Sequence, residues 1–246
     1  MTLIDDDARE VPLGMLDAEL LVPALLHELR QPLMGADAAA ALLERVGGGA
    51  LTVREEWQLL RQQLGRLAEV MGGFEELFRA GQGVSAPFEV GRAVARAVDL
   101  LAHRVRPLAC RFALTSGDGP LRGFGAPSAL VHAATNVLSN ALDAVEQVDR
   151  KGRVEVRVLP ASACVEVRVS DEGAGIPEDL RARLFEPRFT TKPQGKGTGF
   201  GLHLSRLLME RYGGEVFLVE AGDPARLPWA VTEFCIAVPS PPGGAP

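Results

Sequence analysis

The sequence predicts an antiparallel helical hairpin followed by an α/β two-layer sandwich with a mostly antiparallel sheet. Three observations lead to this fold class. Apolar residues recur in steps of four and three over residues 13–80, glycine-rich segments interrupt that pattern, and valines alternate with charged residues in two later segments. We therefore expect a helical unit at 1–82, a flexible linker at 83–87 and an α/β domain at 88–240.

The first helix is expected to end at the glycine run 47–49, because glycine is poorly tolerated inside helices. Its apolar seam comprises Val22, Leu26, Leu29, Leu33, Ala36, Ala40 and Leu43. The second helix is expected to begin at Thr52, which fits a capping box with Glu55. Its apolar seam comprises Trp57, Leu60, Leu64, Leu67, Met71, Phe74 and Phe78.

A lone hairpin buries two apolar seams poorly, whereas two hairpins packed as a four-helix bundle bury both. The seams therefore predict a homodimer in which each chain contributes one hairpin to the bundle. Packing of the hairpin against the rest of its own chain is the alternative.

In the second half, helices are expected at 88–103, 126–149 and 202–212, and strands at 154–158, 164–170, 215–220 and 231–238. The alternation of valine with arginine and glutamate predicts that the first two strands bury one face only. Short turns between consecutive strands favour antiparallel pairing. The proline- and glycine-rich tail at 239–246 is expected to be loose.

Composition restricts the function classes. The 246 residues include 26 Lys and Arg against 32 Asp and Glu, a net charge of −6, which disfavours nucleic-acid coating but not a nucleotide pocket. Three widely separated cysteines without a CxxC pair indicate neither a disulfide framework nor a zinc site. The acidic N-terminus and the lack of a run of about 18 apolar residues predict a cytoplasmic protein without a membrane span.

A candidate nucleophile lies in the first helix. His27 follows the seam residue Leu26, so its side chain points about 100° away from that residue, at the edge of the seam. The adjacent carboxylate of Glu28 can take or hold a proton of the imidazole ring. Pro32 removes a helical hydrogen bond and is expected to bend the helix here. An ordinary surface histidine is the alternative.

A second candidate site lies on the helix at 126–149. Asn136 and Asn140 are four residues apart and therefore share one face, and Asp143 follows on the same helix. A carboxamide oxygen is a suitable hard ligand for Mg²⁺ when phosphate oxygens and water complete the shell. Capping or surface polar residues are the alternative.

A third candidate follows the strand at 164–170. Asp171 at the strand end can accept a hydrogen bond from an exocyclic amine such as that of adenine, and Gly173 and Gly175 allow a flat ligand to approach the backbone. A tight turn without a ligand explains the same residues.

The glycine-rich segment 195–201 leads into the next helix. Successive glycine amides before a helix N-terminus form an anion cradle. The spacing is not that of a Walker A loop, and no strand directly precedes it as in a dinucleotide-binding fingerprint. A flexible glycine-rich loop is the alternative.

Taken together and in this order, the segments resemble the transmitter core of a bacterial two-component sensor histidine kinase over residues 13–238. The resemblance includes a phosphoacceptor box at 27–33, an Asn box at 136–144, a first glycine box at 171–177, a Phe box at 184–192 and a second glycine box at 195–201. The Gln-Pro pair after the histidine and the Phe-Thr-Thr-Lys run are most similar to the nitrogen- and oxygen-sensing subfamily.

The resemblance implies a HisKA-type dimerisation and phosphotransfer hairpin followed by a Bergerat ATP-binding fold, shared with gyrase, Hsp90 and MutL. It implies ATP-dependent autophosphorylation of His27 and transfer of the phosphoryl group to an aspartate of a response regulator. ATP and Mg²⁺ are the implied cofactors. The implied partners are a second copy of the chain and the receiver domain of the regulator, with a separate sensory protein as a source of input.

The resemblance also implies residue roles. His27 is the nucleophile, Glu28 its catalytic neighbour, and Gln31 an auxiliary residue for phosphatase activity. Asp171 reads adenine and Asn140 holds Mg²⁺. The other implied ATP-binding residues are Asn136, Asp143, Gly173, Gly175, Lys192, Gly197, Thr198, Gly199, Gly201 and Leu202.

Some positions depart from the family pattern. Arg188 replaces an aromatic residue of the Phe box, Phe200 a leucine, and His203 a serine. These departures keep open a degenerate dimeric scaffold that binds nucleotide and docks a regulator without kinase activity. A stand-alone ATPase is disfavoured because Asn136 is a poor base where such enzymes usually have glutamate.

No sensory domain is expected, because only about twelve residues precede the first helix. The chain is therefore either an excised core or a soluble kinase that receives its input through a partner. The start at Met1 favours an intact short protein.

Overall fold

The computed structural model describes residues 29–30, 33–47, 56–61, 63–64, 67, 71, 84–106, 112–116, 119–148, 152–192 and 199–243. The chain divides into two compact units, Met1–Glu75 and Glu76–Pro246. None of the helices in the described ranges is long and apolar enough to cross a bilayer.

In the first unit, residues 33–47 and 56–61 are helical. The two helical segments contact each other through polar groups. The indole nitrogen of Trp57 donates to a carboxylate oxygen of Glu44 at 2.9 Å, and Arg61 pairs with Glu44 at 3.3 Å and also with Asp37. Asp37 of the first segment contacts Arg61 at the end of the second, and Glu44, further along the first, contacts Trp57 near the start of the second. The two segments therefore run antiparallel.

The predicted apolar seams lie largely open in this unit. Ala40 and Trp57 are buried, but Leu29, Leu43 and Leu60 are 55%, 53% and 47% exposed. Covering exposed leucine side chains with another apolar surface lowers the free energy of the protein. Dimerisation through the hairpin of a second copy of the chain remains a prediction, and the exposed leucines of the seams favour it.

The second unit contains a five-stranded sheet in the order β2, β4, β5, β7, β6. The strands are β2 (Phe112–Ser116), β4 (Val154–Pro160), β5 (Cys164–Asp171), β6 (Glu215–Leu218) and β7 (Thr232–Pro239). β2 and β4 are parallel and all other neighbours are antiparallel. The mostly antiparallel sheet expected from the sequence is confirmed.

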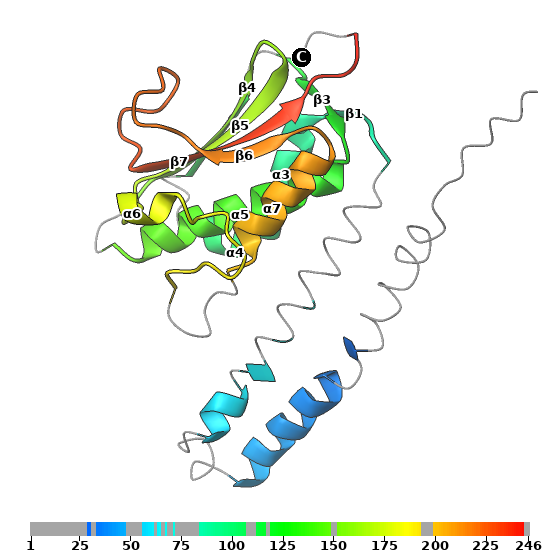
Figure 1. Cartoon of the computed structure of the whole chain (residues 1–246), viewed down its shortest axis with the longest axis vertical. Coiled ribbons are helices and arrows are strands. Elements are labelled where there is room, and N and C mark those ends of the chain that lie inside the picture. Colours follow the sequence, from blue (N-terminus) through cyan, green and yellow to red (C-terminus); the bar gives the residue numbers. More distant parts are fainter. Residues whose placement is uncertain are drawn as a thin grey trace, which may run out of the picture. The chain divides into compact units, whose positions relative to one another are not determined.

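Three helices cover one face of this sheet (Figure 1): α3 (Val90–Leu100), α5 (Pro127–Glu146) and α7 (Gly201–Arg211). Two short helices are α4 (Ala102–Val105) and α6 (Glu178–Arg181). The alternating valines of β4 and β5 point to the helices and are fully buried beside Leu130 and Leu142 of α5. The two-layer α/β sandwich is therefore confirmed.

The start of the second unit differs from the expectation. Phe88 and Glu89 belong to β1 (Ala86–Glu89), which pairs with β3 (Arg122–Gly125) as a separate small sheet. Pro87, expected in the linker, is also part of β1, opposite Phe124. Proline is compatible with such an edge strand because it needs no ladder donor there. The expected helix at 88–103 is divided at Leu101, whose backbone leaves the helical region between α3 and α4.

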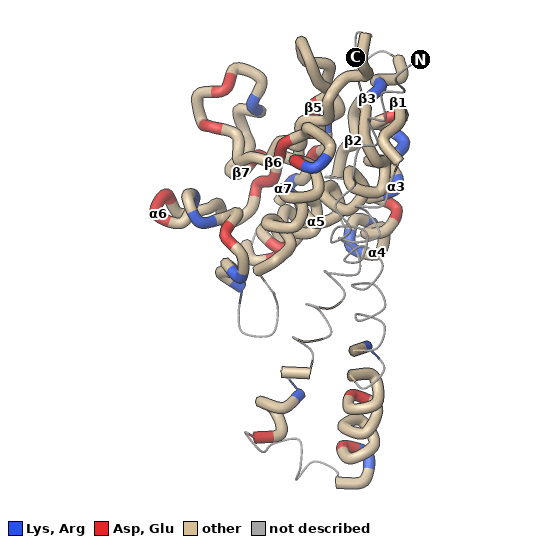
Figure 2. Tube along the Cα trace, turned by 45° about the vertical axis from the view of Figure 1, so that its right-hand side comes forward, with Lys and Arg blue, Asp and Glu red and all other residues tan. Residues whose placement is uncertain are grey.

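The second face of the sheet also differs from the expectation. The alternation in β4 and β5 predicted exposed charged residues, but Arg168 of β5 is only 4% exposed. Glu233 of β7 contacts Arg168 on the same face and is fully buried. The loop at 219–231 between β6 and β7 bonds to side chains on this face, and Figure 2 shows both acidic and basic residues along it. The strands are therefore buried on both faces near the end of β5.

Candidate functional site

A cavity of about 270 Å³ lies between α5, the end of β5, the loop after α6 and the start of α7. Its predicted lining residues come from four separate sequence motifs. They are Asn136, Asn140, Asp143, Asp171, Gly175, Lys192, Gly199, Gly201 and Leu202. Together with Thr232 and Phe234, which also line it, segments up to 98 positions apart (from 136 to 234) meet around one space. His27, Glu28, Gln31, Gly197 and Thr198 lie outside the described residues.

One end of the cavity contains a buried carboxylate. Asp171 is the last residue of β5 and is 3% exposed. One of its oxygens accepts a hydrogen bond from the backbone N–H of Gly173 at 2.9 Å. Among the described residues, none donates a hydrogen bond to its second oxygen. Burial raises the pKa of Asp171 to about 6, although the Gly173 hydrogen bond and the charge of Arg226 act in the opposite direction. The site thus offers a desolvated acceptor to a ligand donor.

Thr232 was missed by the sequence reasoning. It lies directly opposite Asp171 in the register of β5 and β7, is 5% exposed and lines the cavity. Its hydroxyl can both donate and accept beside the carboxylate. The inward positions of β7 are otherwise apolar, with Phe234 and Ile236 following. A polar residue at a core position of an alternating strand is the pattern that would have identified it.

The first glycine box serves packing as well as the cavity. A Cβ on Gly173 would lie 2.5 Å from the Cβ of Ala144 on α5, so a side chain is excluded there by the helix. Gly173 is not among the described residues that line the cavity, where room for a flat ligand was expected. Gly175 does line it and adopts a φ of +78°, which favours glycine.

The carboxamide of Asn136 is oriented by two neighbours. Its Nδ2 lies 2.7 Å from Nε2 of His132 and donates to Oγ of Ser205 at 3.2 Å. The Ser205 hydroxyl in turn donates to the backbone oxygen of Gly201 at 2.8 Å. Because these contacts use the amide nitrogen, the amide oxygen of Asn136 is available as an acceptor. Neither His132 nor Ser205 was predicted as part of the site.

The cavity is also lined by Lys192, which is paired with residues of α5. The ammonium of Lys192 donates to Oδ1 of Asn140 at 3.0 Å and pairs with Asp143. Asp143 also pairs with Arg104 of α4 at 2.6 Å. The cavity is therefore lined by a buried carboxylate at the end of β5 and by carboxamide oxygens and a lysine ion pair along α5.

Comparison with known families identifies the domain. Residues 125–242 match the family described as histidine kinase-, DNA gyrase B-, and HSP90-like ATPase. These residues therefore resemble the ATPase domain that histidine kinases, DNA gyrase B and HSP90 share. The match covers every described residue that lines the cavity.

Similar proteins extend the likeness beyond this domain. The two-component sensor PprA of Pseudomonas aeruginosa is 29% identical over 232 residues, which cover 91% of this chain and 25% of PprA. The sensor protein kinase PilS of the same species is 31% identical over 192 residues, which cover 77% of this chain and 36% of PilS. The chain thus spans between a quarter and about a third of the length of these curated relatives.

Solved structures share the fold. Full-length ShkA in complex with AMPPNP aligns with a TM-score of 0.62 and 24% identity over 88% of this chain and 44% of that chain. Histidine kinase ThkA in complex with the response regulator protein TrrA aligns with a TM-score of 0.57 and 17% identity, over 93% of this chain and 64% of that chain. At these identities the likeness concerns the fold alone.

Two of the departures from the family pattern have structural roles in the ATPase domain. Arg188 adopts a φ of +67°, and a Cβ on Gly199 would lie 2.3 Å from its carbonyl carbon. The backbone at 188 is therefore in close contact with the start of the second glycine box. Nδ1 of His203 lies 2.9 Å from the backbone oxygen of Phe185, which connects α7 to the loop after α6.

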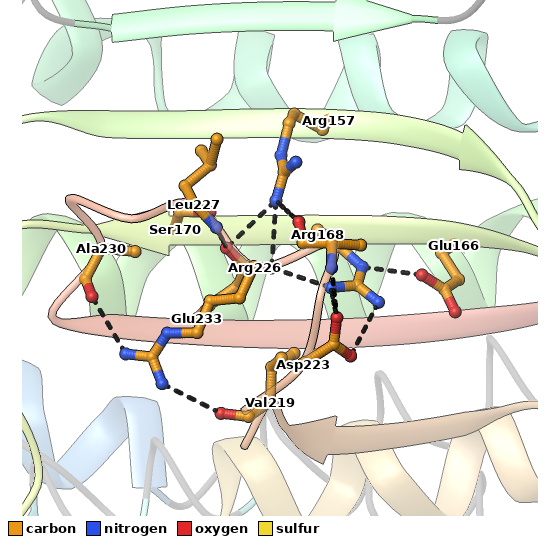
Figure 3. Close-up of polar contacts among 11 residues, drawn as sticks. Arg157, Glu166, Arg168, Ser170, Val219, Asp223, Arg226, Leu227, Ala230 and Glu233 are labelled. Atoms are coloured by element: carbon orange, nitrogen blue, oxygen red, sulfur yellow. Dashed lines mark hydrogen bonds and ion pairs between the residues drawn. The ribbon is translucent and has the colours of Figure 1, made fainter. Parts of the chain in front are cut away.

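A buried ion network lies behind the Asp171 end of the cavity (Figure 3). The carboxylate of Glu233 accepts from Arg157 at 3.0 Å, Arg168 at 3.1 Å and the Ser170 hydroxyl at 2.6 Å. Arg168 also bonds to both oxygens of Asp223, at 3.1 and 3.2 Å, which fastens the loop at 219–231 to β5. The hydrogen bond from Arg168 is the main reason that the pKa of Asp223 lies below its usual value.

This network supports the cavity from the opposite face of the sheet. Ser170 directly precedes Asp171 in β5, and Glu233 directly follows Thr232 in β7. Because neighbouring residues of a strand point to opposite faces, the side chains of Ser170 and Glu233 lie on the face of the sheet away from the cavity. The N–H of Val231, at the end of the loop, also donates to the backbone oxygen of Asp171 at 2.9 Å. The positions of Asp171 and Thr232 are therefore fixed by contacts that the cavity itself does not reveal.

Proposed function

We propose that the chain is the transmitter core of a sensor histidine kinase, which binds ATP in the cavity and phosphorylates His27. The observation that carries the proposal is the single cavity that joins buried Asp171 to Asn140 and Lys192. The designations of PprA and PilS as a two-component sensor and a sensor protein kinase support it. So does the AMPPNP complex of ShkA, since AMPPNP is an analogue of ATP.

The adenine base binds at the Asp171 end. The second carboxylate oxygen of Asp171 accepts a hydrogen bond from the exocyclic amine, while its first oxygen stays on Gly173. Thr232 lies opposite and provides a hydroxyl beside the base. A buried, pre-oriented acceptor discriminates strongly between an amine and a carbonyl at the same place on a base.

The phosphates bind at the other end. The amide oxygens of Asn136 and Asn140 are hard donors that suit Mg²⁺, and that of Asn140 already accepts from an ammonium group. Mg²⁺ bound there supplies neutralising charge to the triphosphate. The backbone of Gly199 and Gly201 at the start of α7 lines the same space, where helix N-terminal amides favour anions.

The phosphoryl step uses a residue outside the described ranges. A ring nitrogen of His27 attacks the γ-phosphorus, the bond from that phosphorus to the bridging oxygen breaks, and ADP leaves with the electron pair. Glu28 holds the proton of the other ring nitrogen. The phosphoryl group then passes to an aspartate of a response regulator. The ThkA structure with its response regulator supports such a partner.

The assembly follows from the first unit. The half-exposed seam residues Leu29, Leu43 and Leu60 favour a homodimeric four-helix bundle with residues 1–82 as the phosphotransfer unit. Residues 83–85 then connect it to the ATPase domain, which begins with β1 at Ala86 and extends to residue 240. A separate sensory protein can act on the bundle. We place the protein in the cytoplasm, where ATP and response regulators are available.

The decisive experiment compares wild type with His27→Ala after incubation with γ-labelled ATP and Mg²⁺. Wild type is expected to acquire an acid-labile, alkali-stable label, and the variant to bind ATP without acquiring it. ATP binding with no label in wild type would favour the degenerate scaffold instead. Rapid ATP turnover without a phosphoenzyme would favour a stand-alone ATPase, although Asn136 is a poor base for activating water.

Adenine binding is expected to depend on pH through Asp171. The amine donates to the carboxylate, so protonation of a group with a pKa of about 6 competes with the ligand. Affinity for adenosine is therefore expected to fall as pH is lowered through about 6, to about tenfold weaker at about pH 5 than at about pH 8. Adenosine is the appropriate ligand because it has no titrating phosphate. A pH dependence that persists in Asp171→Asn would assign the titration to another group.

A further inference from the structure

Lys192 lines the cavity beside Asn140, where the proposed function places the phosphates. It donates to the amide oxygen of Asn140 at 3.0 Å and pairs with one carboxylate oxygen of Asp143. The Lys192 and Asp143 side chains are 27% and 25% exposed, so water screens this pair only in part. The lysine charge is thus bound to the wall of the cavity that the triphosphate would enter.

The second oxygen of Asp143 has its own cation. Arg104 bonds to it at 2.6 Å and extends along α5, to Ser139 at 3.1 Å and to Glu146 at 2.9 Å. Two cations and two carboxylates therefore form a neutral cluster. Arg104 continues to neutralise Asp143 if Lys192 leaves, so departure of the lysine does not strand a lone carboxylate.

Lys192 and Mg²⁺ compete for the amide oxygen of Asn140. Asn140 is the residue assigned to Mg²⁺ under the proposed function, yet its Oδ1 already accepts from Lys192. An ammonium and a metal ion at one oxygen repel each other. Loading the cavity with Mg²⁺ and a triphosphate therefore requires Lys192 to give up Asn140, and the phosphate oxygens are the nearest incoming anions.

We propose that Lys192 is a displaceable cation, held by Asn140 and Asp143 before the nucleotide binds and transferred to a phosphate oxygen when it binds. The inference rests on the proposed function and adds a role for Asp143. Asp143 is then a positioning residue that competes with the phosphates for Lys192, rather than a contact of the nucleotide. Arg104 determines the strength of that competition because it shares the carboxylate.

The test is the affinity of Asp143→Asn for ATP and for adenosine, measured by calorimetric titration with Mg²⁺ present. Loss of the competing carboxylate is expected to tighten ATP binding about three- to fivefold, the size of one partly exposed ion pair. Affinity for adenosine, which has no phosphate, should not change. Glu146→Gln is the matched control, since it removes the same charge from the same Arg104 but does not contact Lys192; it should alter ATP affinity less than twofold.

A Lys192→Met background separates release of the lysine from simple repulsion. Lys192→Met should weaken ATP but not adenosine binding, and Asp143→Asn should then give no further gain. A gain of the same size in that background would mean that Asp143 acts on the phosphates directly, which overturns the proposal. Weaker ATP binding by Asp143→Asn alone would overturn it as well. If wild type bound neither ATP nor adenosine, the proposed function itself would be wrong.

Discussion

Replacing Asp171 with asparagine is expected to weaken ATP binding by about 2–3 kcal/mol, or about 30- to 150-fold. The carboxylate has two acceptor oxygens, one on the Gly173 N–H at 2.9 Å and one for the adenine amine. An asparagine has one acceptor and one donor, so one N–H must face another whichever way the amide turns. The buried site, with Asp171 only 3% exposed, has little water to relieve that conflict.

The base specificity should shift in a defined direction. If the asparagine oxygen stays on Gly173, its NH₂ group points to the base and suits a carbonyl oxygen better than an amine. Asp171→Asn is therefore expected to favour inosine triphosphate relative to ATP, whereas wild type favours ATP. Asp179→Asn, an exposed carboxylate on α6, is the control and should change neither affinity. An unchanged ATP to inosine triphosphate ratio in Asp171→Asn would remove Asp171 from base recognition.

The sequence predicted the local parts of this site and not the contacts between strands. The spacing of Asn136 and Asn140 on a helix and the position of Asp171 at a strand end are local properties, and the structure places all three around one cavity. Thr232 joins Asp171 only through the register of β5 and β7, which are joined by a long connection. The register between two strands that are far apart in the sequence depends on how the whole core packs. A single sequence therefore gives little indication of which residues of β5 and β7 lie opposite each other.

The same division applies to the fold. Strong alternation identified β4 and β5, whereas β1 and β3 are four residues long and contain proline or glycine, so they carry no clear period. Alternation also indicated a solvent face at Arg168 that the loop at 219–231 covers. Charged residues are normally exposed unless paired, and the partner here, Asp223, is 55 positions away. The pattern identified the strands correctly but not the burial of their charged face.

Arg168→Met is expected to lower the free energy of unfolding of the ATPase domain by about 3–5 kcal/mol, measured by urea denaturation. Glu233 is fully buried, and loss of one guanidinium leaves its charge poorly compensated, while Asp223 loses both of its bonds to Arg168. The control is Arg92→Met, which breaks the exposed pair of Arg92 with Glu89 and should cost less than about 1 kcal/mol.

A double-mutant cycle distinguishes the ion network from loss of packing. Arg168→Met combined with Glu233→Gln removes the stranded charge as well as its partner, so the double variant should lose less stability than the sum of the two single variants. Strict additivity would mean that Arg168 acts through its aliphatic stem alone. Because Ser170 and Glu233 adjoin Asp171 and Thr232 in β5 and β7, Arg168→Met should also weaken adenosine binding while the domain remains folded. An unchanged adenosine affinity would show that the strand ends keep their positions without the network.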